Sequence, residues 1–267
     1  MAAVTLPLPQ QPPASNPMRL DDLVQYLNGY LRIGEVGDDP LALNGLQVEN
    51  GGEVQSVAVA VDACQAVIDQ AAQRGADLLV VHHGLFWSGL EPLVGRHYRR
   101  VAALVRHGIA LYSAHIPLDR HPEVGNNVVL ARKLGMEVRG WFGHYHGSPI
   151  GTWGELDLSR EGLAARLEEI LGRAPRLIAG GPDRVRRVGI ITGAAGSMLK
   201  DASEAALDSF VTGEGQHWTY FDAEELGVNA YFAGHYATET LGVRALAEHI
   251  AERFRLPWSF IDHPTGL

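Results

Sequence analysis

Cysteine is almost absent from this sequence: Cys64 is the only one among 267 residues. No disulfide can form within the chain, which is typical of proteins from a reducing compartment. The sequence also lacks any apolar stretch close to the ~20 residues that span a bilayer. Residues 1–17, rich in Pro, Gln and Ala, have neither the charged start nor the apolar core of a signal peptide. These absences predict a cytoplasmic protein outside the membrane, with a flexible tail at residues 1–17.

Basic residues are in the minority, with 22 Lys and Arg against 31 Asp and Glu and a formal net charge of −9. Proteins that bind a nucleic-acid backbone normally present a basic face. The charge balance therefore argues against a nucleic-acid partner.

Several catalytic and nucleotide-binding motifs are missing as well. The sequence has no GxGxxG, GxxxxGK[ST] or GxSxG pattern. The segment ITGAAGS at residues 191–197 fits none of them, and we interpret it as a tight turn between a strand and a helix. Cys64 has no histidine nearby in the sequence, so packing is the expected role for this residue. Core packing is also the expected role of Trp87.

Short β-branched runs alternate with amphipathic segments along most of the chain, which predicts an α/β fold with sheets flanked by helices. Strands are predicted near residues 56–63, 77–83, 109–115, 187–193, 208–214, 228–235 and 258–262. Residues 44–52 are expected to form a loop, and residues 136–180 are less regular. The repeated rhythm in both halves predicts two lobes, about 18–125 plus 229–267, and 126–228.

Ligands of α/β proteins bind beyond the carboxyl ends of the strands. Four of the predicted strand ends carry a histidine together with a carboxylate or a second histidine. These residues are His82 and His83, His115 and Asp119, Glu214 and His217, and His235 and Glu239. This recurrence predicts a metal site at the carboxyl ends of the strands, between the lobes.

His82 and His83 are adjacent, and successive side chains on a strand point to opposite faces. They serve two neighbouring metals more easily than one, and Gly84 would let the chain turn there. Alone, the pair is equally compatible with a structural strand end. The HxxxD spacing alone would suggest a solvated loop, and HxxxE a surface helix pair; only their combination favours a dinuclear centre.

Glu239 follows His235 by four residues at a predicted helix start, so both side chains can face one point. We interpret Glu239 as a bridge between two ions, whose residual positive charge would attract an anionic group. The other histidines lack ligand-like spacing or lie in a Gly-rich loop. They are His97, His107, His121, His144, His146, His249 and His263.

The motifs NGLQVEN, HHG, SAHIPLD, VTGE and AGHYATE, in this order from Asn44 to Glu239, resemble the family of GTP cyclohydrolase 1 type 2 homologues, the Nif-three-like dinuclear metal proteins. The resemblance implies a two-lobed α/β protein that forms a hexameric ring. It also implies five metal ligands and two histidines near the metals. The ligands would be His82, His83, Asp119, His235 and Glu239, and the nearby histidines His115 and His217.

Together these features predict a protein with two divalent ions per chain, acting as a metal-dependent hydrolase on a nucleotide or another small, anionic phosphorylated metabolite. Mixed nitrogen and oxygen ligands suit Zn, Fe, Mn or Ni. His115 or His217 would carry protons, because histidine titrates near neutral pH. The alternative is a non-catalytic metal-binding ring that acts as a scaffold.

Overall fold

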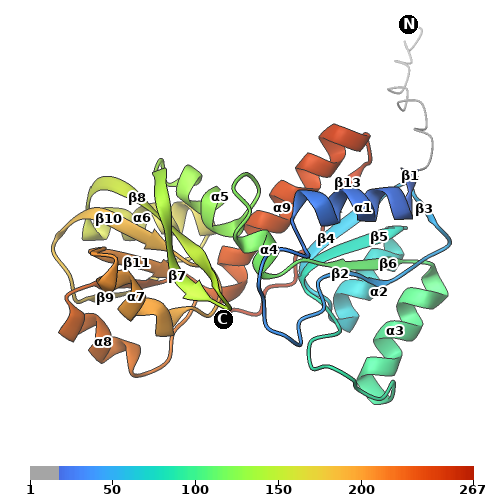
Figure 1. Cartoon of the computed structure of the whole chain (residues 1–267), viewed down its shortest axis with the longest axis horizontal. Helices are drawn as coiled ribbons and strands as arrows, with labels where there is room; N and C mark the ends of the chain where they lie inside the picture. Colours follow the sequence, from blue (N-terminus) through green and yellow to red (C-terminus); the bar gives the residue numbers. More distant parts are fainter. Residues whose placement is uncertain (1–17) are drawn as a thin grey trace, which may run out of the picture.

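A computed structural model of the chain describes residues 18–267, and the tail predicted at residues 1–17 lies outside them. Two β-sheets lie side by side, each flanked by helices, and one long helix, α9 (His235–Phe254), runs between them (Figure 1). The α/β class with helix-flanked sheets is therefore confirmed.

The first sheet has five strands in the order β13-β4-β5-β6-β2. They are β2 (Gly45–Val48), β4 (Val57–Asp62), β5 (Leu78–His83), β6 (Ala110–Ser113) and β13 (Trp258–Phe260). All run parallel except β2, which pairs antiparallel with β6. A separate short pair joins β1 (Met18–Arg19) to β3 (Glu53–Val54).

Strands β4 and β5 are apolar on both faces, because helices cover both. On β5, Leu78 and Val80 pack with α1 and α9, whereas Leu79 and Val81 pack with α2 and α3. These three further helices are α1 (Leu20–Tyr30), α2 (Gln65–Gln73) and α3 (Gly95–His107). The alternation directs the residue after Val81 toward α9.

The second sheet has six strands in the order β7-β8-β10-β11-β12-β9, of which β10, β11 and β12 are parallel. They are β7 (Glu137–Tyr145), β8 (Ser148–Ser159), β9 (Arg176–Ala179), β10 (Arg184–Ile190), β11 (Ser209–Thr212) and β12 (Asn229–Phe232). One face packs on α5 (Asn126–Lys133) and α6 (Arg160–Leu171), and the other on α7 (Leu199–Glu204) and α8 (Thr219–Leu226). A short helix, α4 (Ile116–Asp119), follows β6, and a 3₁₀ turn (Gly196–Met198) precedes α7.

Helix α9 belongs to both hydrophobic cores. Val243, Leu246 and Ile250 pack into the core of the first sheet, whereas Leu241 packs into that of the second. The helix therefore ties the lobes together, and its first turn lies where they meet.

Three segments differ from the sequence prediction. Residues 45–48 form the edge strand β2 instead of a loop, because β6 offers them a pairing partner. The irregular middle contains the β7–β8 hairpin, the two longest strands. Strand β12 pairs with β11 in the second sheet, whereas the sequence prediction grouped residues 229–267 with the first lobe. Helix α9 and strand β13 return the chain to the first sheet.

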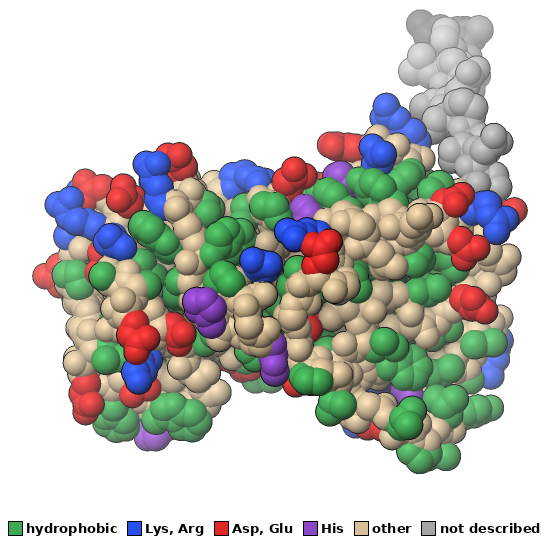
Figure 2. Space-filling view, in the orientation of Figure 1, with side chains coloured by type: hydrophobic (Ala, Val, Ile, Leu, Met, Phe, Trp, Pro, Cys, Tyr) green, Lys and Arg blue, Asp and Glu red, His purple; other side chains and the backbone are tan. Residues whose placement is uncertain are grey.

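The surface mixes charges of both signs, and histidine side chains are visible at the waist between the lobes (Figure 2). Among residues 18–267, none of the helices combines the length and the apolar character that crossing a membrane requires.

Candidate metal centre

The sequence-predicted ligands meet at the carboxyl end of the first sheet, opposite the start of α9. His82 and His83 end β5, and Asp119 ends α4. His235 opens α9, and Glu239 follows one turn later on the same face. Segments from well-separated parts of the chain thus bring these side chains to one place.

The adjacent histidines both face Glu239. His82 is fully buried and follows the strand alternation toward α9, whereas His83 lies at the strand end, with its ring 4.7 Å from that of His82. His82 Nε2 lies 3.5 Å from Oε1 of Glu239, and His83 Nε2 lies 3.5 Å from Oε2. Each histidine therefore lies next to a different oxygen of the same carboxylate.

Two further residues lie beside the Glu239 carboxylate, one on the side of each histidine. His235 Nε2 lies 3.1 Å from Oε2, on the side of His83. Asp119 Oδ2 lies 3.6 Å from His82 Nε2, on the other side. His115 joins the same cluster: one ligand atom from each of His82, His83 and His115 lies within 4.8 Å of the others.

Every histidine of the cluster is held at its outer ring nitrogen. The Nδ1 atoms of His82, His83, His115 and His235 lie 2.9, 2.9, 2.8 and 2.8 Å from their acceptors, which are the Ala114 carbonyl and the carboxylates of Asp62, Asp38 and Glu214. Because these oxygens only accept, Nδ1 must donate, and a neutral ring then turns its Nε2 lone pair inward. This is the arrangement that orients histidine ligands in metalloproteins.

Residues of helix α5 and of the loop after β10, in the second lobe, contact the cluster. Asp119 Oδ1 accepts hydrogen bonds from Asn126 Nδ2 at 2.8 Å and Thr192 Oγ1 at 3.2 Å. Gly193 follows β10 with φ +72°, and a Cβ there would collide with Oε1 of Glu239. The absence of a side chain at Gly193 thus leaves room for the Glu239 carboxylate.

The charges of the cluster depend on one another. Burial alone would lower the pKa of His82, but the carboxylates of Asp119 and Glu239 raise it to about 10. The nearby Glu239 carboxylate is the main cause that raises the pKa of His235 to about 9. Burial would raise the pKa of Glu239, yet the surrounding histidines hold it well below its usual range. In the absence of a cation, protons on the histidines balance the carboxylates.

The donor set fits a metal ion. His82 Nε2 and Glu239 Oε2 are buried without a hydrogen-bond partner, a costly arrangement unless another species satisfies them. Bonds of about 2.0–2.2 Å to a tetrahedral ion place its donor atoms roughly 3.3 Å apart. The separations around Glu239, 3.1 to 3.6 Å, match that spacing.

Some predicted residues lie elsewhere or act differently. His217 is exposed on the loop before α8, against Phe221, and the structure does not bring it into the cluster. His144 and His146 are exposed in and beside the β7–β8 turn. Gly84 does not adopt the left-handed conformation that favours glycine; instead, a Cβ there would collide with the Gln47 side chain.

Sequence reasoning missed two of the outer acceptors. Asp62 ends β4, beside β5, so the strand-end argument could have found it. Asp38 lies in a loop far along the chain from His115 and carries no signal of its own. Trp87, expected in the core, instead lines a cavity of about 370 Å³ that opens beside the cluster.

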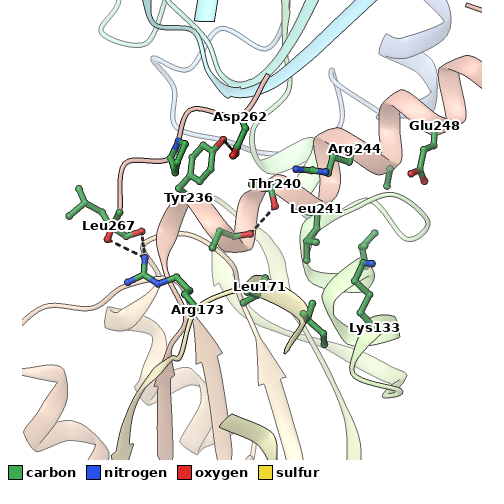
Figure 3. Close-up of a pocket in the computed structure, with 17 residues that line it drawn as sticks. Lys133, Leu171, Arg173, Tyr236, Thr240, Leu241, Arg244, Glu248, Asp262 and Leu267 are labelled. Carbon is green, nitrogen blue, oxygen red and sulfur yellow. Dashed lines mark hydrogen bonds between the residues drawn. The ribbon is translucent and has the colours of Figure 1, made fainter. Parts of the chain in front are cut away.

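A larger groove of about 900 Å³ lies on the opposite side of α9 (Figure 3). Tyr236 and Thr240 line this groove. His235 and Glu239, which directly precede them in the sequence, do not. Its lining contains no histidine, so this groove is separate from the metal-ligand cluster.

Comparison with known proteins places the chain among relatives of similar sequence and fold. A family model described as Duf34/NIF3 (NGG1p interacting factor 3) matches residues 18–265. Relatives named GTP cyclohydrolase 1 type 2 homolog include one from Deinococcus radiodurans, 43% identical over 92% of this chain and 94% of the relative. Another, from Halobacterium salinarum, is 44% identical over 94% of this chain and 100% of the relative.

Solved structures show the same fold. Protein ybgI, described as of unknown function, has a TM-score of 0.87 at 40% identity, covering 94% of this chain and 100% of that one. A crystal structure of a protein from Thermus thermophilus gives 0.86 at 45% identity with the same coverage. With the sequence match spanning all the elements that build the site, the chain belongs to the Duf34/NIF3 family.

Proposed function

We propose that the chain holds two divalent metal ions and acts as a metal-dependent hydrolase. His82, Asp119 and Oε1 of Glu239 would hold one ion, and His83, His235 and Oε2 of Glu239 the other. The observation that carries the proposal is the buried Glu239 carboxylate, which turns one oxygen to each group. The nitrogen and oxygen donors suit Zn, Fe, Mn or Ni.

Two such ions would supply an activated water and positive charge for a developing oxyanion. His115 is the residue that we propose to move protons. Asp38 holds its Nδ1 at 2.8 Å, and the ring lines the cavity beside the cluster. His115 can therefore accept a proton from the attacking water and return it to the leaving group. His217 has no part in this proposal.

The proposed substrate is a small anionic metabolite, with phosphate esters and nucleotides as the class to test. The name carried by the relatives suggests GTP itself as one member of the panel. Protein loaded with each of the four metals should be incubated with this panel and product release measured. Turnover that requires metal and falls strongly in His115→Gln, while His144→Gln keeps it, is the expected result.

Two outcomes would contradict the proposed hydrolase function. Fully metal-loaded protein that turns over none of the panel would favour the scaffold alternative. Turnover that survives complete metal removal would contradict the metal-dependent mechanism.

A further inference from the structure

The cavity beside the cluster has one polar end and one apolar end. His83, His115, Asp119, His235 and Glu239 form the polar end. The remaining wall is mostly apolar and includes Trp87, Ile116, Tyr145, Ile150, Ile191 and Met198. At about 370 Å³ the cavity lies near the lower end of the range for small-molecule sites.

Positive side chains are missing from this cavity. Within residues 18–267, none of its lining residues is Lys or Arg. Lys133, Arg173 and Arg244 instead line the groove on the other side of α9 (Figure 3). A long phosphate chain in the cavity would find no protein cation to neutralise it.

Four backbone amides of the loop after β10 are already used within the protein, so they cannot replace those cations. Thr192 N–H donates to Asn127 Oδ1, and Gly193 N–H to Thr238 Oγ1. The amides of Ala195 and Gly196 donate to Thr212 Oγ1 and the Glu214 carbonyl. A loop that cradles phosphates needs free amides pointing at the ligand.

The acidic groups around the site also disfavour a ligand with several negative charges. Besides Asp119 and Glu239, the carboxylates of Asp38, Asp62 and Glu214 hold three of the histidines. Two divalent ions bring four positive charges, against five negative charges from these carboxylates. The loaded centre can anchor one anionic group by direct coordination, but its surroundings repel further negative charge at short range.

We propose that the substrate carries a single anionic group on a compact, uncharged and largely apolar body, such as an aryl or small heterocyclic ring. The anionic group would bind at the metals, and the body would lie against Trp87. The Trp87 ring stands edge-on to His115 with centroids 4.6 Å apart, so a group bound beside His115 is within reach of the indole. This inference rests on the proposed two-metal centre and makes a triphosphate a poor fit.

Binding to metal-loaded protein tests the inference without turnover. Calorimetry should compare inorganic phosphate, phenylphosphonate and a non-hydrolysable GTP analogue. Burying a phenyl ring should make phenylphosphonate bind about 10–100-fold more tightly than phosphate. The GTP analogue should bind more weakly than phenylphosphonate. Trp87→Ala should remove most of the phenyl advantage and leave phosphate affinity unchanged.

Trp218→Ala is the matched control, because Trp218 is exposed and lies outside the cavity; it should behave as wild type. Equal affinities for phosphate and phenylphosphonate, or tightest binding by the GTP analogue, would overturn the inference and leave the metal centre intact. An aryl preference that persists in folded Trp87→Ala would also overturn it. Failure to bind metal at all would refute the proposed function and, with it, this inference.

Discussion

Glu239 is the residue on which the candidate centre depends. It is 2% exposed, and its carboxylate faces His82 on one side and His83 and His235 on the other. If it bridges two ions, its charge offsets their mutual repulsion.

Replacing Glu239 should therefore weaken both sites together. Glu239→Gln keeps the side-chain shape and its helix propensity, yet it should lower affinity at both sites by more than the roughly 10–100-fold cost of losing an outer hydrogen-bond partner. Asp119→Asn should mainly empty one site. Metal titration with elemental analysis measures both, and Glu248→Gln, exposed on the same helix, is the control. Folded Glu239→Gln that still binds two ions normally would show that Glu239 is not a bridge.

The raised pKa values of His82 and His235 predict that metal binding releases protons. In the metal-free protein both rings are protonated at pH 7, since their pKa values are about 10 and 9. A metal needs their neutral form, so apparent affinity should rise as pH increases toward 9. Titrations in buffers of different ionisation enthalpy count the protons. Binding that releases none at pH 7 would contradict this.

The raised pKa values of His82 and His235 also predict how the stability of the metal-free protein depends on pH. Histidines with raised folded pKa values stabilise the fold fully below their unfolded value of about 6.5. That contribution is lost as pH rises through about 9 to 10. Chelated protein should therefore melt at progressively lower temperature over this range.

At the residue scale, sequence reasoning selected side chains that the structure brings close together. His82, His83, Asp119, His235 and Glu239 could be selected because parallel strands and a following helix bring such positions together. Asp38 and Trp87 could not, because loop residues approach the site through tertiary packing that leaves no periodic signal in the sequence.

At the scale of elements, the turn between β10 and the 3₁₀ segment shapes the site. Gly193 combines positive φ with close approach to Glu239 and His235. Any side chain there would displace a proposed ligand as well as strain the backbone.

Gly193→Ala should thus reduce metal affinity far more than its effect on stability explains. Gly172 gives a matched control: it also has φ +72°, but a Cβ there would meet nothing within 4 Å. Both variants should lose about 1 kcal/mol or more through strain. Only Gly193→Ala should also lose metal binding, measured by titration with circular dichroism as the folding check. Equal metal affinity in the two variants would refute the steric role of Gly193.

The elements most open to sequence prediction were the buried strands β4, β5 and β6, whose apolar runs reflect helices on both faces. Strand β2 was missed because a short edge strand depends on its neighbour rather than on its own pattern. The β7–β8 hairpin was missed because its glycines, such as Gly140, Gly151 and Gly154, resemble loop signals. In the structure, a Cβ at any of the three would crowd neighbouring atoms.

At the scale of the whole molecule, the cluster joins the two lobes. His82 and His83 come from the first sheet, whereas Thr192 and Glu214 follow strands of the second and hold Asp119 and His235. An ion bound between them would stabilise the arrangement of the lobes as well as the local site.

Metal should consequently raise the melting temperature. At free metal about 100 times the dissociation constant, each bound ion adds about 2.7 kcal/mol, or roughly 5–10 °C per ion for a chain of this length. Scanning calorimetry with and without chelator measures the shift. The shift should be much smaller in Glu239→Gln, and an unchanged melting temperature in wild type would argue against specific binding.

The last prediction concerns assembly, which the family resemblance implies to be hexameric. Leu90, Leu93, Val94 and Tyr98 are exposed large apolar side chains close together in the sequence, and such patches on soluble proteins often mark interfaces. Light scattering at micromolar concentration should give about six times the 28.9 kDa chain mass. If the patch contributes to an interface, a double variant, Leu93→Lys with Val94→Lys, should lower that mass, because lysine is poorly tolerated in an interface core. Its metal stoichiometry should stay unchanged, since the proposed ligands all belong to one chain. A monomeric wild-type protein would refute the hexamer. A hexameric double variant would show that the interface lies elsewhere.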